Sequence, residues 1–378
     1  MRIGIEAQRI FRKKKHGMDI VAVQMIKELQ KIDRVNEYFI FVNPDVDTAT
    51  ISESENFKII PLKKSPYPIW EQKHLSEAVK TYRLDLLHCT GNTAPINTSV
   101  PLVLTLHDII YLEKTDVRSG SWYQRLGNLY RKWNVPKVVR NSDAIFTVSE
   151  FEKKVIDKYF KFEKEKVKVI YNGVAHHFQP HSITAITDKI KDYGLPKKYL
   201  LFLGNTAPKK NLKGVLLALK KLDQKGKLNM DIVMPDFGEN ELNALLASID
   251  AKSIRNKIHL TGYIPNQDLP YVYSGAEMFL YPSLRESFGL PILEAMACGC
   301  PVITSNTSSM PEIAGDAAVL VDPFNPEAIC EAIENLLQDQ VLRSSLISKG
   351  YARVPLFSFE QGAKTILDTY SKIHDMHK

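Results

Sequence analysis

Short apolar runs alternate with amphipathic stretches along the whole chain. Runs of this length, rich in Val, Ile, Leu and Phe, are typical of strands that are buried on both faces of a parallel sheet. The predicted strands are Arg2–Glu6, Tyr38–Val42, Lys58–Ile60, Asp85–Cys89, Leu102–Leu106, Asp143–Ser149 and Val167–Ile170, and then Tyr199–Leu203, Ile232–Met234, Ile258–Leu260, Met278–Tyr281, Val302–Thr304 and Val319–Val321.

Helical spacing of apolar residues fills many of the intervals between these strands. The predicted helices include Ile20–Leu29, Glu71–Tyr82, Leu212–Leu222, Glu239–Ile249, Pro326–Leu337 and Phe359–Ile373. Strands that alternate with helices in both halves predict an α/β protein with two doubly wound sheets that face each other. We place the domain boundary in the polar, proline-containing segment His176–Ser182. We therefore expect domains at 1–178 and 179–358, and one last helix in 359–378.

The composition is that of a globular protein. Of the 378 residues, 44% are hydrophobic and 25% are charged, which is ordinary for folded domains, and the length suffices for two cores. No apolar run is long enough to span a bilayer, and the N-terminus has the pattern of a strand rather than of a signal peptide. The four cysteines form no metal-ligand or disulfide pattern, so we expect buried thiols in a reducing cytoplasm (Cys89, Cys298, Cys300 and Cys330).

The formal net charge of +7 arises in the first half of the chain. Residues 1–178 contain 29 Lys and Arg against 21 Asp and Glu, whereas the remainder contains 21 against 22. Such an uneven excess indicates that the first half faces an anionic partner. Nucleic acid, a phosphorylated acceptor and an anionic membrane surface all fit this description.

The segment Tyr281–Pro301 contains the most informative pattern of the second half. An apolar strand leads into a loop with Glu286 and Gly289, and a helix follows with Pro291 in its first turn and Glu294 one turn further in. The amides at such a helix start attract an anion, typically phosphate. Two carboxylates beside a phosphate site are explained if they bind neutral hydroxyl groups, so the pattern indicates a nucleotide sugar.

Two further loops follow strands at the same predicted edge of the second sheet. One contains Asn205, Lys209 and Lys210, and a lysine at this place can neutralise a phosphate as a point charge. The other contains Tyr263 and Ile264, against which a base could be seated. Three loops at one edge form a more specific pattern than any of them alone.

Two loops of the first half lie at the corresponding edge of its predicted sheet. The basic loop after the first strand contains Lys14, Lys15 and Gly17, and it fits a solvated loop as well as a phosphate contact at Gly17. The pair His107 and Asp108 ends another strand. Its position and polarity favour a functional site over a histidine that merely binds a loop carbonyl.

The segment 118–140 mixes aromatic and basic residues at helical spacing, among them Trp122, Tyr123, Tyr130 and Trp133. Such a helix could dock on a membrane surface. A helix with its aromatic side chains in the core and its charges in water is the slightly preferred interpretation.

The run SLRESFGLPILEAMACGCPVI closely resembles the E-x7-E motif of the retaining glycosyltransferases of family 4, which have the GT-B fold. The run APKKN is similar to the P-R-K-N of that family, and NGV at 172–174, TVSEFEKKVI and SSMPEIAGDAAVLVDP also look like family segments. The similarity covers nearly the whole chain, and it is greatest to bacterial mannosyltransferases of lipopolysaccharide and capsule assembly. It implies two facing Rossmann-like domains with the active site in the cleft between them. The first domain would bind the acceptor and the second the nucleotide sugar, and the C-terminal helix would pack back toward the first.

The resemblance implies a role for each matching position. Lys210 would bind the donor diphosphate, Glu286 would hold the hydroxyls of the transferred sugar, and Glu294 would hold the ribose. His107 would contact the sugar, and Glu312 matches a recurrent acid of the family. The catalytic set is then His107, Glu286 and Lys210. The other donor-binding positions are Gly17, Asn205, Lys209, Tyr263, Ile264, Ser287, Phe288, Gly289, Leu290 and Glu294, and Asp108, Lys14 and Lys15 are expected on the acceptor side.

Two positions depart from the family pattern. Asn205 stands where the family often has arginine, and Lys209 or a basic residue of the first domain would have to compensate. The loop at Gly17 lacks the usual double glycine.

The predicted reaction is the transfer of a hexose, with mannose from GDP-mannose as the best match, to a glycan or a polyprenyl-linked acceptor. Stabilisation of the departing diphosphate by Lys210 and the helix start would supply the catalysis, so no metal and no further cofactor are expected. Retention on the family pattern implies that the acceptor attacks from the face that the diphosphate leaves. The expected location is the cytoplasm, with the inner face of the cytoplasmic membrane as a candidate site of action.

Three alternatives remain open. The donor could be UDP-glucose, UDP-galactose or UDP-N-acetylglucosamine. A nucleotide-sugar epimerase of similar fold would not need the basic, aromatic side of the first domain. A non-catalytic sugar or nucleic-acid binding module is the third, and the acids Glu286 and Glu294 are an awkward lining for a polyanion, so no nucleic-acid partner is expected.

Overall fold

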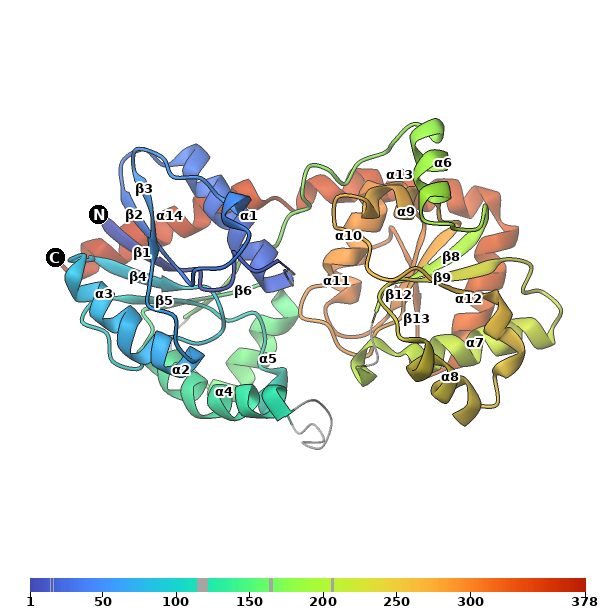
Figure 1. Cartoon of the computed structure of the whole chain (residues 1–378), viewed down its shortest axis with the longest axis horizontal. Coiled ribbons are helices and arrows are strands. Elements are labelled where there is room, and N and C mark those ends of the chain that lie inside the picture. The colour runs from blue at the N-terminus through green and yellow to red at the C-terminus, as the bar shows by residue number, and fades with distance from the viewer. Residues whose placement is uncertain (14, 16, 114–121, 163–165, 205–206) are drawn as a thin grey trace. The chain divides into compact units, whose positions relative to one another are not determined.

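The computed structural model describes residues 1–13, 15, 17–113, 122–162, 166–204 and 207–378, without the side chains of 122–125. The chain divides into two compact units. Unit 1 comprises Met1–Asn172 and Ser358–Lys378, and unit 2 comprises Gly173–Phe357. In Figure 1 the red C-terminal helix accordingly lies among the blue and green elements of unit 1. The boundary expected after residue 178 lies a few residues further along the chain than this division.

The described residues of unit 1 form a seven-stranded sheet in the order β3-β2-β1-β4-β5-β6-β7. All neighbouring strands run parallel, so their carboxyl ends meet at one edge. The strands are β1 (Arg2–Glu6), β2 (Glu37–Val42), β3 (Phe57–Pro61), β4 (Leu86–Cys89), β5 (Leu102–Thr105), β6 (Ala144–Thr147) and β7 (Val167–Val169).

Helices connect these strands and cover the sheet (Figure 1). They are α1 (Gly17–Ile32), α2 (Tyr67–Ile69), α3 (Ser76–Thr81), α4 (Trp122–Asn141), α5 (Glu150–Phe160) and α14 (Phe359–Met376), with the 3₁₀ turns η1 (Thr48–Thr50) and η3 (Ile110–Leu112) and the π-helix η2 (Trp70–Leu75). The prediction of one helix over Glu71–Tyr82 missed this π segment, because apolar spacing does not report where a helix widens by one residue.

The last helix of the chain completes the core of unit 1. Helix α14 packs along α1, and four of its residues lie in the same buried cluster as β1 and β2 (Ala363, Ile366, Tyr370 and Ile373). Its Tyr370 hydroxyl lies 2.5 Å from Nδ1 of the buried His88 on β4. Burial lowers the pKa of His88 to about 3, so this contact joins two neutral groups at physiological pH.

The described residues of unit 2 form a six-stranded parallel sheet in the order β10-β9-β8-β11-β12-β13. The strands are β8 (Tyr199–Phe202), β9 (Asp231–Met234), β10 (Ile258–Leu260), β11 (Met278–Tyr281), β12 (Val302–Ser305) and β13 (Val319–Val321). The helices are α6 (Ile183–Asp192), α7 (Leu212–Gln224), α8 (Glu239–Ser248), α9 (Leu269–Gly275), α10 (Leu290–Ala297), α11 (Met310–Ala314), α12 (Pro326–Gln338) and α13 (Gln340–Arg353), with the 3₁₀ segments η4 (Pro208–Lys210), η5 (Lys252–Lys257) and η6 (Val354–Leu356).

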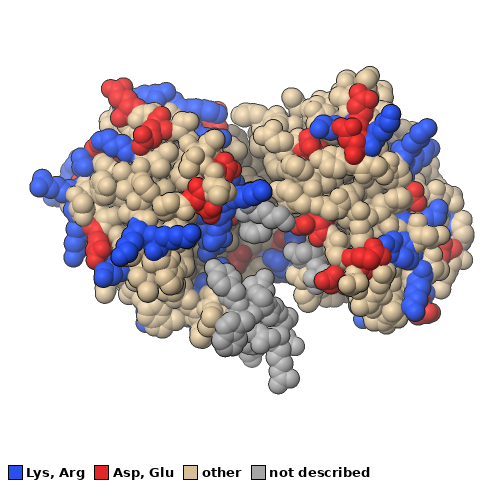
Figure 2. All heavy atoms as spheres, viewed as in Figure 1, with Lys and Arg blue, Asp and Glu red and all other residues tan. Residues whose placement is uncertain are grey.

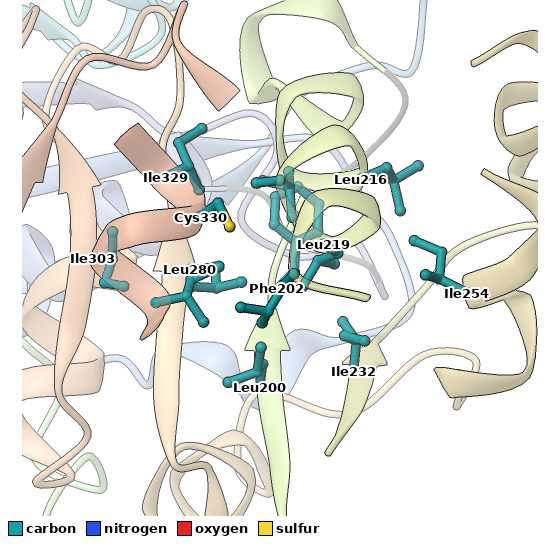
Figure 3. Close-up of a cluster of buried hydrophobic side chains, with 14 of the residues drawn as sticks. Leu200, Phe202, Leu216, Leu219, Ile232, Ile254, Leu280, Ile303, Ile329 and Cys330 are labelled. Atoms are coloured by element: carbon teal, nitrogen blue, oxygen red, sulfur yellow. The ribbon is translucent and has the colours of Figure 1, made fainter. Parts of the chain in front are cut away.

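One apolar cluster joins the sheet of unit 2 to the helices on one of its faces. Phe202 of β8 and Leu280 of β11 point from the sheet toward Leu219 of α7 and Ile329 of α12 (Figure 3). All of these side chains are almost completely inaccessible to solvent, and burying such a side chain contributes roughly 1.5–3 kcal/mol. The cluster therefore holds β8 and β11 rigidly, and these two strands position the loops described next.

The fold class and every predicted strand are confirmed, with ends that shift by a residue or two. Parallel strands covered on both faces are almost wholly apolar, which makes them conspicuous in a sequence. The helices α5, α6, α9, α11 and α13 were not predicted. Helices α9 and α11 span only seven and five residues, and α13 has a weak apolar face, whereas α5 and α6 have a clear apolar face and were missed nonetheless.

Candidate active site

Three loops lie at the carboxyl edge of the unit 2 sheet, after β8, β11 and β12. The three strands are neighbours in the sheet, so the loops that follow them lie side by side. The first loop leads into η4, the second contains Glu286 and leads into α10, and the third leads into α11. Ligands of open α/β sheets bind at this edge.

A buried ion pair joins the first two loops. The Lys210 Nζ lies 2.7 Å from Oε1 of Glu286 and also donates to the Tyr281 hydroxyl at 2.9 Å. The two charged side chains are only 17% and 10% exposed. Burial by itself would raise the pKa of Glu286, but the charges of Lys210 and Lys209 and the hydrogen bond from Lys210 lower it below its ordinary value. Glu286 is therefore a carboxylate at neutral pH.

The same two loops are also tied through their backbones. The Leu284 amide donates to the Lys209 carbonyl at 2.7 Å. Asn211 has a positive φ of 59°, and its Nδ2 donates to the carbonyls of Pro282 and Pro323 at 2.9 and 2.7 Å. An amide side chain with two donors is suited to bridge two loops in this way. Lys209 and Lys210 are thereby fixed relative to Glu286.

Helix α10 begins directly after this loop. Gly289 precedes it with φ 101°, a backbone conformation that side-chain-bearing residues rarely adopt. The first amides of a helix have no partner within the helix and lie at the positive end of its dipole. Ser287 and Leu290 are half-buried, whereas Phe288 is buried and packs edge-on against Phe357.

Glu294 lies one turn inside α10 and is 8% exposed. The Tyr273 hydroxyl donates to its Oε2 at 3.2 Å. Burial raises the pKa of Glu294 to about 7, and the hydrogen bond from Tyr273 opposes that shift. The two acids of the motif thus differ in ionisation, since Glu286 is paired with a cation and Glu294 is not paired with one in the contacts above.

The third loop braces the second. The Ser309 hydroxyl lies 2.9 Å from each of the carbonyl oxygens of Glu286 and Phe288. The Ser308 hydroxyl donates to the Glu286 carbonyl at 2.6 Å and lies 3.1 Å from the Glu286 amide. The backbone that carries Glu286 and Phe288 is therefore held by side chains of the third loop.

The predicted base-binding positions lie at the same edge, after β10. Tyr263 is 51% exposed and Ile264 is 4% exposed. Strand β10 is separated from β8 by β9, so these residues lie roughly two strand spacings, or about 10 Å, along the edge from the β8 loop. Ile264 is part of the core, and Tyr263 is the more accessible of the two. Glu312 lies in α11, and its carbonyl accepts from Arg353.

His107 lies in unit 1 at the carboxyl end of β5 and is 5% exposed. Its Nε2 lies 3.0 Å from the Thr90 carbonyl, and its amide donates to Oδ1 of Asn92. Burial lowers the pKa of His107 although the Thr90 carbonyl opposes this. The histidine does bind a loop carbonyl, and this contact fixes its ring with a proton on Nε2.

The remaining unit 1 positions have different surroundings. Lys15 forms an ion pair with Asp47 of the segment after β2 and donates to the Arg12 carbonyl at 3.1 Å, so its charge is offset by a neighbouring loop. Gly17 begins α1 and is exposed. Asp108 accepts from the amide of Ile110. Lys14 of this loop and Asn205 of unit 2 lie outside the described residues.

Several residues of the site were not predicted. Asn211, Tyr273, Tyr281, Ser308 and Ser309 hold the predicted residues in place. Two signals could have found some of them: Asn211 ends the run APKKN, and the serine-rich run after β12 places polar residues after a buried strand. Within the described ranges, no three His, Cys, Asp or Glu side chains lie close enough together to hold a metal ion.

The exposure of side chains on helix α4 differs in part from what the sequence predicted. Trp133 is 48% exposed, and Leu126 and Leu129 are exposed beside it, so the prediction that the aromatic side chains of this helix lie in the core is wrong for Trp133. Leu126, Leu129, Trp133, Lys137 and Arg140 recur at the spacing of one helix face, and the Lys137 ammonium lies 4.1 Å from the Trp133 ring centroid. Among the helices that can be described, none is long and apolar enough to cross a membrane.

Comparison with known proteins extends over almost the whole chain. Residues 183–353 match the family model "Glycosyl transferases group 1", and residues 16–178 match "Glycosyltransferase Family 4". The chain is similar to the O-antigen chain mannosyltransferase B of Escherichia coli, at 27% identity over 94% of this chain and 95% of the relative.

Two solved structures share the fold across nearly their full length. Sucrose-phosphate synthase of Thermosynechococcus elongatus superimposes with a TM-score of 0.76 at 18% identity, covering 99% of both chains. Anabaena HepE in complex with UDP and glucose superimposes with a TM-score of 0.75 at 18% identity, covering 98% of this chain and 99% of that one.

Proposed function

Because the chain belongs to the retaining glycosyltransferases of family 4, with the GT-B fold, we propose that it transfers mannose from GDP-mannose to a glycan or lipid-linked acceptor of a bacterial surface polysaccharide. The observation that carries the proposal is the Lys210–Glu286 pair at the start of α10, with Glu294 one turn further on. The choice of mannose rests on the E. coli relative, which is named a mannosyltransferase.

The donor diphosphate would lie at the start of α10. The ion pair with Glu286 holds Lys210 close to that helix start, and the positive charge of Lys209 lowers the pKa of the same carboxylate. Cations and helix amides stabilise the negative charge that grows on a departing diphosphate. A diphosphate would draw Lys210 partly away from Glu286, so donor binding and the ionisation of Glu286 are coupled.

The acids would hold the neutral parts of the donor. Glu286 is ionised and can accept hydrogen bonds from the hydroxyls of the transferred sugar. Glu294, on the inner part of α10, would accept from the ribose. In the reaction the bond between the anomeric carbon and the phosphate oxygen breaks, and an acceptor oxygen forms the new bond on the same face. The acceptor proton passes to the leaving diphosphate, and His107 would contact the sugar from unit 1.

A transfer assay tests the donor. Purified protein is incubated with GDP-mannose, UDP-glucose, UDP-galactose or UDP-N-acetylglucosamine and an octyl glycoside acceptor, and the product linkage is read by NMR. We expect mannosyl transfer with the anomeric configuration of the donor retained. A product with the inverted anomeric configuration would contradict the retaining mechanism. Turnover with UDP-sugars alone would contradict GDP-mannose as the donor. Interconversion of nucleotide sugars without transfer would identify an epimerase.

We also propose that helix α4 places unit 1 on an anionic membrane. The exposed face combines Leu126, Leu129 and Trp133 with the basic Lys137 and Arg140, which is the composition of an interfacial helix. On the face seen in Figure 2, Lys and Arg side chains of unit 1 are spread out with Asp and Glu between some of them. The charges on this face are thus mixed in sign, and the membrane proposal rests on helix α4.

Vesicle co-sedimentation tests the membrane proposal. We expect binding to vesicles with 30 mol% phosphatidylglycerol, a proportion chosen for the experiment, and little binding to pure phosphatidylcholine. Trp133→Ser should weaken it, whereas Tyr159→Ser serves as a control because Tyr159 of α5 is exposed to the same extent, 49% against 48%. Equal binding of the two variants, or binding that ignores lipid charge, would contradict the proposal.

A further inference from the structure

The chain leaves unit 2 at Phe357, and this residue lies against the candidate active site. Unit 2 ends at Phe357 and unit 1 resumes at Ser358, which caps α14 by accepting from the Gln361 amide. Phe357 follows η6, and its amide donates to the Val354 carbonyl at 3.0 Å. Its side chain is only 7% exposed. The residue at which the chain crosses from one unit to the other is therefore buried and is not part of a free linker.

The Phe357 ring packs on the loop that precedes α10. This loop, residues 282–289 and called the donor loop below, follows β11 and contains Glu286. Phe288 of the loop is 4% exposed, and its ring meets the Phe357 ring edge-on, with centroids 5.9 Å apart and 79° between the planes. Aromatic pairs favour this arrangement, and one such contact changes an equilibrium constant by roughly two- to tenfold. The contact therefore favours the ordered form of the donor loop.

Arg353 links the Phe357 ring to helix α11. Its guanidinium carbon lies 5.5 Å from the Phe357 ring centroid. Its Nε and Nη2 donate to the carbonyls of Ile313 and Glu312, at 2.5 and 2.6 Å. Carbonyls in the last turn of a helix lack partners within the helix, and a charged donor satisfies them well. A Cβ at Gly315 would come within 2.5 Å of the guanidinium, so a glycine directly after α11 leaves the space that Arg353 needs.

Helix α11 holds the donor loop at its other end. Ser309 directly precedes this helix, and its hydroxyl oxygen lies 2.9 Å from the carbonyl oxygens of Glu286 and Phe288. Two sets of contacts thus link η6 to the backbone around Phe288, one through the ring of Phe357 and one through Arg353 and α11. A loop that is ordered before its ligand arrives binds more tightly, because the apparent affinity scales with the fraction of molecules in the competent conformation.

We propose that Phe357 is a positioning residue of the donor site, which orders the donor loop and couples it to the point where the chain enters unit 1. The inference rests on the proposed function, in which the start of α10 binds the donor diphosphate. Phe357 acts through Phe288 and touches neither the donor nor the reacting atoms. Coupling free energies are reciprocal, so donor binding should in turn order the segment around Phe357.

The affinity of the full-length protein for GDP and UDP, measured by calorimetry, gives the first test. Phe357→Leu keeps an apolar side chain and removes the ring, and we expect the Kd of the nucleotide that binds to rise by about two- to tenfold. Phe288→Leu should also weaken binding. The double variant should lose less than the product of the two single effects, because both remove the same contact. Independent effects of the two substitutions, or an unchanged Kd in Phe357→Leu, would overturn the positioning role.

Two variants of unit 2 serve as matched controls. Leu356→Ala changes the neighbouring residue in η6, which is 68% exposed, and should leave the Kd unchanged. Ile254→Val shortens a fully buried side chain of η5. Like Phe357→Leu, it should lower the melting temperature by roughly 2–4 °C, but without a change in Kd. Equal losses of affinity in Ile254→Val and Phe357→Leu would show that general destabilisation explains the effect, and the positioning role would be rejected.

Hydrogen exchange gives the reciprocal readout. With nucleotide bound, the amides of 354–362 should exchange about threefold more slowly, or slower still, in the wild type and in Leu356→Ala. This protection should be lost in Phe357→Leu. Helix α8, remote from these contacts in the chain, is the reference segment and should gain less protection. Equal protection of α8 and 354–362, or none at 354–362 in the wild type, would contradict the coupling.

Exchange in the ligand-free protein separates this inference from the proposed function. If neither GDP nor UDP binds, the proposed function fails. The positioning role is then retained only if the amides of the donor loop exchange faster in Phe357→Leu than in the wild type and in Ile254→Val. Equal exchange of the donor loop in all three proteins would refute it.

Discussion

The Lys210–Glu286 pair yields the sharpest prediction, because its structural and chemical roles can be separated. At 2.7 Å, two unit charges attract by about 6 kcal/mol with an effective dielectric constant of 20, and the cost of removing both from water offsets much of this. Breaking such a pair by removal of one partner costs roughly 3–5 kcal/mol, whereas replacing both partners is far less costly. The pair therefore predicts strong coupling between the two positions.

The perturbation is a double-mutant cycle of Lys210→Met and Glu286→Gln. We expect each single variant to lose about 3 kcal/mol of the free energy of unfolding, and the double variant to lose less than their sum by about 2 kcal/mol or more. The assay is urea unfolding followed by fluorescence, with sugar transfer measured on the same preparations. Transfer should be lost in all three variants, because each of them lacks the cation for the diphosphate, the carboxylate for the sugar hydroxyls, or both.

The dependence on pH gives a second readout. In the wild type the pKa of Glu286 is lowered. Its contribution to the free energy of unfolding is therefore fully present above the pKa of the unfolded state, about 4.5, and is lost as the pH falls through the lower pKa of the folded state. In Lys210→Met the buried carboxylate has lost its cation, and its pKa should rise. The destabilisation by Lys210→Met should therefore be larger at pH 8 than at pH 5.

The surface pair Lys220–Asp250 is the matched control in the same unit, because its side chains are 20% and 100% exposed. The cycle of Lys220→Met and Asp250→Asn should show no coupling beyond the error of measurement, as is typical of exposed pairs. Additive losses at Lys210 and Glu286 would refute the energetic reasoning. Wild-type transfer by their double variant would refute the chemical role.

Three further predictions concern the same loops. Burial raises the pKa of Glu294 to about 7, so the native state binds more protons than the unfolded state between about pH 4.5 and 7. As the pH rises across this window, the free energy of unfolding of the wild type should fall by about 3 kcal/mol relative to that of Glu294→Gln. A difference between the two proteins in urea unfolding that does not change with pH would argue against this. Asn211→Ala removes two hydrogen bonds to Pro282 and Pro323 and should lower the free energy of unfolding by about 1–3 kcal/mol and weaken GDP binding in a thermal-shift titration; unchanged GDP affinity would show that the bridge does not support the site. Gly289→Ala forces a side chain into a backbone with φ 101° and should lower the free energy of unfolding by about 1–3 kcal/mol. It should lower the melting temperature and the GDP affinity more than Gly127→Ala, a control glycine within helix α4. Equal effects of the two variants would contradict the role of Gly289 at the helix start.

The sequence predicts the strands of this protein better than its helices. Strands such as Met278–Tyr281 and Val319–Val321 were placed to the residue, because a strand buried on both faces needs apolar side chains throughout. Strand order was not predicted, since each parallel pair joins segments that are far apart in the chain. The π-helix at Trp70–Leu75 was missed for a different reason, because apolar spacing does not show where a helix widens by one residue.

The parts of the site that could be predicted are those whose geometry is set within one loop and the helix that follows it. The order of Glu286, Gly289 and Glu294 around a helix start follows from local sequence, and the structure has that geometry. The ion pair between Lys210 and Glu286 does not follow from local sequence, because it joins loops 76 residues apart. The raised pKa of Glu294 depends likewise on the packing of the whole domain around it.

Helix α14 has a consequence for how the protein is made. Unit 2 is one continuous segment, whereas unit 1 is completed only by Ser358–Lys378. Ala363, Ile366 and Tyr370 fill part of the core of unit 1, so that core is incomplete until Ser358–Lys378 has been synthesised. The unit whose synthesis starts first is therefore completed last, and a chain shortened before Ser358 would contain all of unit 2 but an incomplete unit 1.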